Sequence, residues 1–282
     1  MSSHTSQTLE KTITNASLTY RSDTWWFEPL WTGLGFFIFV IYSTWSAFQA
    51  KYYFDNPYLS PFYSPLLFVE PSMPGSAPVH HAWLGIWPGW WPQFLPPSPA
   101  LIILAGPLSF RMTCYYYRKF YYRAYFMTPP ACAVKPLPQN NYKGETGLFI
   151  FQNLHRYTLY IAIFYILALF VDAFRSFSKD GQLGIGVGSV ILLLNPILLS
   201  FYTFGCHAFR HLIGGKADSF SCCGGSNSNK STVGHTLWEK VTKLNEHHMF
   251  WAWVSMIWVG FTDLYVRMVS MGIWHDFNTW GH

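Results

Sequence analysis

The sequence predicts an all-α membrane protein, a bundle of five transmembrane helices with a cytoplasmic N-terminus and an external C-terminus. Of its 282 residues, 51% are hydrophobic and only 11% are charged, against about 25% charged in an ordinary soluble domain. Fourteen Trp and eighteen Tyr exceed what a soluble core of this size needs, whereas these rings are favoured at both headgroup levels of a bilayer. Lipid is therefore the expected solvent.

Five stretches are apolar enough to span the hydrocarbon layer, which takes about 20 helical residues. They cover residues 27–48, 97–117, 148–171, 183–209 and 248–269. We expect kinks at Pro107 and Pro196 inside the second and fourth spans, because proline lacks the N–H of the helix ladder. The polar segment 1–26 has no secretory-signal pattern and is expected in the cytoplasm. Residues 27–282 then form a single transmembrane domain.

Lysine and arginine set the expected orientation, since positively charged short loops stay in the cytoplasm. Most of these residues, and with them the net charge of +5, lie in and around the loops 118–147 and 210–247. This local distribution argues against nucleic-acid binding. The connections 51–96 and 172–182 carry few basic residues and are expected outside. The segment 51–96 is rich in Trp and Pro, which indicates an aromatic cap at the outer interface.

With this topology, most His and Cys side chains gather at the cytoplasmic ends of the helices. They are Cys114, Cys132, His155, Cys206, His207, His211, His247 and His248. A single membrane cysteine is more often an apolar filler, but several ionisable groups at one depth need partners, and a shared metal would satisfy them. Two thiolates and two imidazoles match a Rieske-type [2Fe-2S] centre, whereas histidines paired across helices match bis-imidazole haem. Cys222 and Cys223 are expected to be ordinary reduced thiols.

Five short motifs carry a family resemblance. They are Arg-Met-Thr-Cys114-Tyr-Tyr-Tyr-Arg-Lys, Pro-Pro-Ala-Cys132, Asn-Leu-His155-Arg, Gly-Cys206-His-Ala-Phe-Arg-His211 and Glu-His-His248-Met. From the second to the fifth span, the chain resembles the membrane-anchor subunit (SdhC) of the type F succinate dehydrogenases. This is the haem-free class of respiratory complex II found in actinobacteria and some other bacteria.

The resemblance implies a bacterial plasma-membrane complex. Its soluble subunits on the cytoplasmic side would be a flavoprotein with covalent FAD, which oxidises succinate, and an iron-sulfur subunit. It also implies that this chain holds a membrane-embedded Rieske-type [2Fe-2S] cluster, from which electrons reach a quinone. This chain alone would not oxidise succinate. The resemblance is compatible with a quinone acceptor of the menaquinone or ubiquinone type. It is also compatible with membrane lipids around this chain and with a higher oligomer of the complex.

The resemblance leaves the four cluster ligands open. For the thiolates we favour Cys114 with either Cys132 or Cys206. For the imidazoles we favour His155 and His248, with His207 and then His211 as replacements. Tyr and Trp rings can donate hydrogen bonds to a quinone carbonyl and stack on its ring, and an unligated His could relay a proton. The expected quinone contacts are Tyr115, Arg118, His211 and Trp251.

Two other functions remain as alternatives. A haem-b quinone-reactive subunit would need His pairs at two depths, and the outer half of the spans lacks the second pair. A non-redox transporter or assembly factor would need a polar site at mid-membrane, where Asn195 stands almost alone. An iron-dependent desaturase would need three HxxxH-type boxes, of which His207 and His211 supply one.

Overall fold

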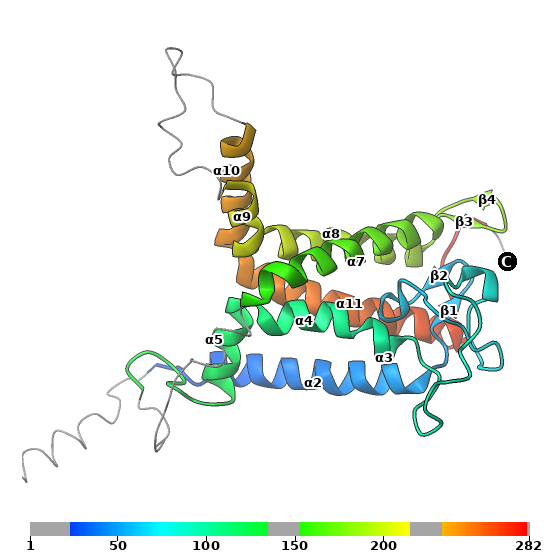
Figure 1. Ribbon diagram of the computed structural model, residues 1–282, viewed down its shortest axis with the longest axis horizontal. Coiled ribbons are helices and arrows are strands. Elements are labelled where there is room, and N and C mark those ends of the chain that lie inside the picture. The colour runs from blue at the N-terminus through cyan, green and yellow to red at the C-terminus, as the bar shows by residue number, and fades with distance from the viewer. Residues whose placement is uncertain (1–22, 135–152, 215–232, 281–282) are drawn as a thin grey trace, which may run out of the picture.

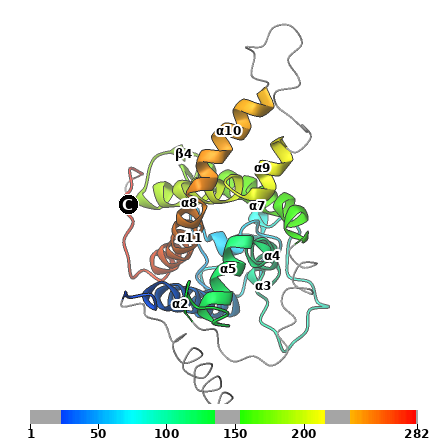
Figure 2. The same cartoon turned by 90° about the vertical axis from the view of Figure 1, so that its left-hand side faces the viewer.

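The computed structural model describes residues 23–134, 153–214 and 233–280. These residues are mostly helical, and the long helices lie side by side (Figure 1). Within them, four helices are long and apolar enough to cross a membrane: α2 (Phe27–Gln49), α7 (His155–Arg175), α8 (Val187–Phe204) and α11 (His248–Ser270). A shorter apolar stretch, Ala100–Thr113, lies among them, and Figure 2 shows the bundle from one end.

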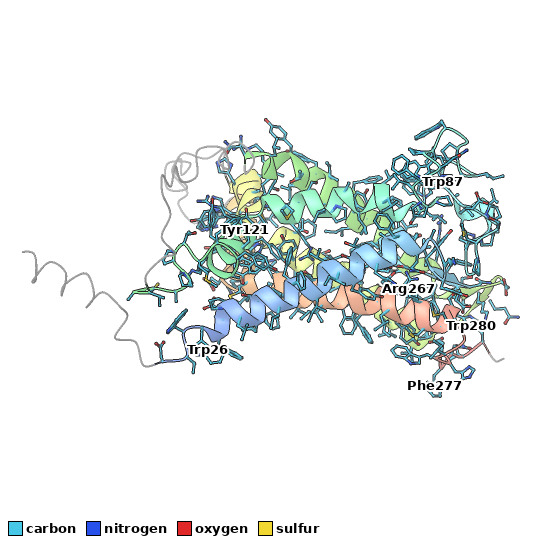
Figure 3. The ribbon with its side chains drawn as sticks, turned by 90° about the horizontal axis from the view of Figure 1, so that it is seen from below. Trp26, Trp87, Tyr121, Arg267, Phe277 and Trp280 are labelled. Atoms are coloured by element: carbon cyan, nitrogen blue, oxygen red, sulfur yellow. The ribbon has the colours of Figure 1, made fainter. Side chains whose placement is uncertain are left out.

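Large apolar side chains cover much of the outer surface of these helices. Phe37 on α2 is 55% exposed and Ile257 on α11 is 62% exposed. Extensive exposed apolar surface is rare on soluble monomers, but lipid chains solvate it. Aromatic residues lie at both ends of the bundle (Figure 3), as membrane interfaces favour; they include Trp26, Tyr121, Trp87 and Trp280.

The second span differs from the single kinked helix expected over residues 97–117. It is divided into α3 (Ala100–Ile103), α4 (Ala105–Thr113) and α5 (Tyr115–Ala124). The first break lies just before Pro107, which has no N–H to donate to the carbonyl of Ile103. The second break is at Cys114, whose backbone is extended, with φ −67° and ψ 131°. As a result, α5 leaves the direction of α4 (Figure 1).

The fourth span is shorter than the expected 183–209. A hairpin of β3 (Ser178–Lys179) and β4 (Gln182–Leu183) precedes α8, and α8 then runs through Pro196 without interruption. Gly205 and Cys206 separate α8 from α9 (His207–Gly214). A Cβ at Gly205 would lie 2.8 Å from the Phe201 carbonyl oxygen, so the close approach here requires glycine.

The remaining helices and the third span complete the bundle. α10 (Val233–Glu246) packs against α9 and leads into α11. The third span, expected over 148–171, is observed from His155 onward as α7, and residues 148–152 lie outside the described part of the chain. The beginnings of α7 and α11 therefore lie at the same end of the molecule as α5, α9 and α10 (Figure 1).

The segment 51–96 lies at the opposite end and connects α2 to α3. Its short elements are β1 (Phe54–Asp55), β2 (Tyr58–Leu59), η1 (Pro61–Tyr63) and η2 (Val79–His81). Tyr53 and Tyr63 stack at 4.2 Å in its buried core. The segment thus packs as an aromatic layer with little regular structure.

A fully buried ion pair on α11 fastens this segment to the helices. Nε of Arg267 lies 3.6 Å from a carboxylate oxygen of Asp263, and both side chains are completely buried. The carboxylate of Asp263 also accepts hydrogen bonds from Tyr42 (2.6 Å) and from Ser60. Arg267 donates to the carbonyl of Lys51 at 2.8 Å, so both members of the ion pair also bond to residues of other segments.

Candidate functional site

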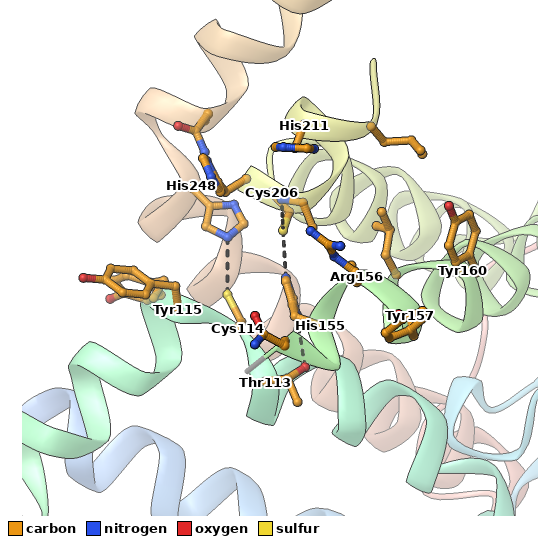
Figure 4. A pocket seen from close by; sticks show the side chains of 17 residues that line it. Thr113, Cys114, Tyr115, His155, Arg156, Tyr157, Tyr160, Cys206, His211 and His248 are labelled. Atoms are coloured by element: carbon orange, nitrogen blue, oxygen red, sulfur yellow. Dashed lines mark hydrogen bonds between the residues drawn. The ribbon is translucent and has the colours of Figure 1, made fainter. Parts of the chain in front are cut away.

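Four of the seven candidate metal ligands come together where helices begin or break. Cys114 separates α4 from α5, and Cys206 separates α8 from α9. His155 is the first residue of α7, and His248 is the first residue of α11. We call these four residues the Cys/His quartet. Figure 4 shows their side chains pointing toward one another from four different places in the chain.

The quartet forms two thiol–imidazole contacts. Sγ of Cys206 lies 2.8 Å from Nε2 of His155, and Sγ of Cys114 lies 3.6 Å from Nε2 of His248. Both cysteines are 2% exposed and His155 is 9% exposed. Both thiols and the His155 ring are therefore largely shielded from bulk water, whereas His248 is half-buried.

Groups behind the two imidazoles fix their orientation. Nδ1 of His155 lies 3.1 Å from the carbonyl oxygen of Phe110, which can only accept a hydrogen bond, so Nδ1 carries the proton and Nε2 offers its lone pair. The His155 ring also stacks on Phe110 at 4.4 Å, and the His248 ring stacks on Tyr202 at 5.0 Å. Such outer contacts orient metal-ligating imidazoles in known sites.

Backbone geometry favours the thiolate form of both cysteines. Cys114 immediately precedes α5, and Cys206 immediately precedes α9. The backbone N–H of Ala208 donates to Sγ of Cys206 at 3.3 Å. Helix N-termini stabilise a neighbouring thiolate through their unpaired N–H groups. These N–H groups therefore offset part of the cost of placing a negative charge on the two buried sulfurs.

The donor types of the quartet are those that the sequence predicts for a metal centre. In the described part of the chain, no group of three or more His, Cys, Asp or Glu side chains is arranged to hold one metal ion. A Rieske-type [2Fe-2S] cluster instead takes two thiolates on one iron and two imidazoles on the other. Two thiols and two imidazoles are what the quartet supplies. The buried Nδ1 of His248 has no hydrogen-bond partner among the described residues. Its capacity to form a hydrogen bond is therefore unused there.

A cavity of about 850 Å³ opens beside the quartet. All four quartet residues line it, together with polar side chains from α7 and α9, namely Arg156, His207 and His211. Tyr157 and Tyr160, 63% and 57% exposed, line its other side. The volume lies within the usual range of about 300–1,000 Å³ for small-molecule sites. The cavity combines an apolar wall with a few convergent hydrogen-bonding groups (Figure 4).

Other residues expected at the site have different positions. Cys132 is exposed on the chain that follows α5, 4.0 Å from the guanidinium of Arg123, and it does not line the cavity. Among the expected quinone contacts, Tyr115 and His211 line the cavity. Arg118 is buried beside the rings of Tyr115 and Tyr122, and Trp251 packs on Phe201.

Residues that support the site were absent from the sequence-based set. Phe110 and Thr113 contact Nδ1 of His155, and Arg156 lines the cavity. The only sequence signal for these residues is their position within four residues of Cys114 or His155. Arg111 precedes the basic loop 118–147 in the sequence, a position typical of an exposed cytoplasmic flank, but it is buried, with 8% of its surface exposed.

A family model and a solved structure both relate this chain to succinate dehydrogenase. A family model described as the actinobacterial succinate dehydrogenase subunit SdhC matches residues 27–272. A chain in the solved structure of the Mycobacterium smegmatis Sdh1 complex in the apo form is similar over its whole fold. It shares 39% sequence identity, with 94% of each chain covered and a TM-score of 0.81. No curated protein matches this sequence.

Proposed function

Because the chain belongs to the family of actinobacterial succinate dehydrogenase SdhC subunits, we propose that it carries electrons to a quinone through a cluster held by the Cys/His quartet. As an SdhC subunit it is a membrane anchor of a succinate dehydrogenase complex, and it is a multi-pass plasma-membrane protein. The partners in this proposal are a flavoprotein subunit with FAD and an iron-sulfur subunit.

The observation that carries the proposal is the quartet itself. Cys114, His155, Cys206 and His248 would hold a Rieske-type [2Fe-2S] cluster, with each donor anchored at a helix end. A cluster of this type transfers single electrons, and its imidazole ligands raise its reduction potential above that of an all-Cys centre. Phe110 and Tyr202 orient the two imidazoles and exclude water from one side of each ring.

The same end of the molecule offers a basic docking surface. Lys119 on α5 is exposed there, and so are Arg156 on α7 and, beside exposed Glu239 and Glu246, Lys240 and Lys243 on α10. Positive charge at this end supports a cytoplasmic orientation and would attract an acidic soluble subunit. In this arrangement Ala100–Thr113 serves as a fifth, shorter span. The N-terminus is then cytoplasmic and the C-terminus external.

The quinone would bind in the 850 Å³ cavity. Arg156 and His211 line it and can donate hydrogen bonds to a quinone carbonyl. The exposed rings of Tyr157 and Tyr160 form an apolar wall through which a lipid-soluble molecule could enter. Because the quartet lines the same cavity, an electron would have only a short distance to travel to a quinone there.

Spectroscopy of the purified complex tests the cluster. In wild type, reduction with dithionite should give an EPR signal with the average g value of Rieske-type centres and no haem Soret band. The signal should disappear in His248→Ala and Cys114→Ser. It should remain in the matched controls His247→Ala and Cys132→Ser, because these exposed residues do not line the cavity.

Three outcomes would contradict the proposal. A Soret band in the wild-type complex would show that the redox group is a haem and not an iron-sulfur cluster. Persistence of the signal in Cys114→Ser or His248→Ala would remove that residue from the ligand set. Loss of the signal in Cys132→Ser would instead indicate that Cys132 is a ligand and that Cys206 only packs in the core.

A further inference from the structure

Arg111 places a positive charge in the membrane interior of the bundle beside the quartet. It lies on α4 and is 8% exposed. Its guanidinium donates hydrogen bonds to the hydroxyl of Tyr117, to the carbonyl of Ala252 at 3.2 Å and to Oγ of Ser255 at 3.0 Å. All three acceptors are neutral, and Arg111 forms no ion pair with any described residue.

Arg267, which is completely buried, differs from Arg111 in having a counter-charge. Arg267 lies 3.6 Å from the carboxylate of Asp263, on the same helix. A buried cation without a counter-charge is costly, by several kcal/mol in real proteins, and intramembrane arginines normally pair with another group. Arg111 has hydrogen-bond acceptors but no counter-charge among the described residues, so a source of negative charge close to it would lower the cost of burying it.

The quartet includes the thiol of Cys114, which is close to Arg111 in the chain and can carry negative charge. Arg111 lies three residues before Cys114, whose backbone N–H donates to the Arg111 carbonyl at 3.2 Å. The guanidinium lies 4.7 Å from the centre of the Tyr202 ring, and that ring stacks on His248. Ala252, which accepts from Arg111, is one helical turn after His248. The arginine is thus fixed next to two of the four donors.

We propose that Arg111 is a positioning residue whose fixed charge raises the reduction potential of the redox group held by the quartet. This inference rests on the proposed function. Two thiolates bring negative charge into the bundle, and reduction adds one more electron. In a medium of low dielectric constant, a neighbouring cation stabilises the two thiolate charges and also the electron added on reduction. The hydrogen bonds that Arg111 donates to Tyr117, Ala252 and Ser255 keep the guanidinium from turning toward solvent.

Redox titration of the intact complex, followed by the EPR signal, tests this role. Arg111→Gln removes the charge, and Arg111→Lys keeps it. At the wild-type midpoint potential, we expect the ratio of reduced to oxidised centre to fall about tenfold in Arg111→Gln, which corresponds to 59 mV for a one-electron couple. Arg111→Lys should shift the ratio much less. Iron and acid-labile sulfide content, measured in parallel, should remain at the wild-type level in Arg111→Lys.

Ser255→Asp supplies a second test that keeps the arginine. Because Oγ of Ser255 is 3.0 Å from the guanidinium, a carboxylate there would neutralise the charge in place and lower the ratio in the same direction. Ser255→Ala, which adds no charge, is its control and should leave the ratio near wild type. Unchanged ratios in Arg111→Gln or Ser255→Asp, or equal shifts in Arg111→Gln and Arg111→Lys, would overturn the inference. Absence of the EPR signal from wild type would instead overturn the proposed function.

Discussion

Breaking the buried Asp263–Arg267 pair should strongly destabilise the chain. Asp263→Ala leaves the Arg267 guanidinium completely buried without its counter-charge, and it removes the acceptor for Tyr42 and Ser60. Loss of one partner of a buried ion pair costs about 3–5 kcal/mol. The magnitude is large because neither side chain can reach water, and because the pair joins α11 to α2 and to the segment 51–96.

A double-mutant cycle separates this effect from simple loss of packing. Arg267→Met should also be strongly destabilising, because it leaves the Asp263 carboxylate unpaired. The double variant Asp263→Ala/Arg267→Met removes both charges. Its loss in free energy of unfolding should be clearly smaller than the sum of the losses in the two single variants. The measurement is a denaturant titration of the detergent-solubilised protein, followed by tryptophan fluorescence.

The pair formed by Asp172 and Arg175 provides a matched control. Its atoms are 3.7 Å apart, but the Arg175 side chain is 59% exposed. Exposed pairs contribute about 0–1 kcal/mol, so Arg175→Ala should have little effect. The reasoning is refuted if Asp263→Ala costs less than about 1 kcal/mol. It is also refuted if the decrease in free energy of unfolding in the double variant equals the sum of the decreases in the two single variants.

Two further predictions concern packing and the cavity. Gly188→Ala should destabilise the protein by about 1–3 kcal/mol, as overpacking does, because its Cβ would lie 2.7 Å from the Tyr58 ring; thermal unfolding of the complex measures this, and an unchanged midpoint would contradict it. His211→Ala, which removes a donor lining the cavity beside Arg156, should raise the quinone KM up to about tenfold, because one hydrogen bond contributes about 1 kcal/mol. Succinate oxidation with a soluble dye as acceptor should be unaffected, and an unchanged quinone KM would place the quinone elsewhere.

The apolar spans were predictable from the sequence because the hydrocarbon layer fixes their length. The first and last spans, expected over 27–48 and 248–269, correspond to Phe27–Gln49 and His248–Ser270. The second and fourth were less well predicted. Their breaks at Cys114 and Cys206 depend on how α5 and α9 pack against neighbouring helices, and hydropathy does not report that packing.

The candidate site was partly predictable for a similar reason. Residue type and membrane depth selected eight Cys and His residues, and the motifs gave the family. Only the tertiary structure separated Cys206, which faces His155, from Cys132, which is exposed beside Arg123. Both lie at a similar depth in the sequence-based topology, so depth could not distinguish them.

By itself, the sequence determined the solvent, the approximate spans and the chemical types gathered at one end, because these follow from composition and local pattern. The tertiary structure decided which of those groups meet. It also moved Arg111 from an apparent surface flank to a buried position beside Tyr202. Contacts between residues far apart in the chain depend on the directions in which helices leave their breaks, and local sequence does not specify those directions.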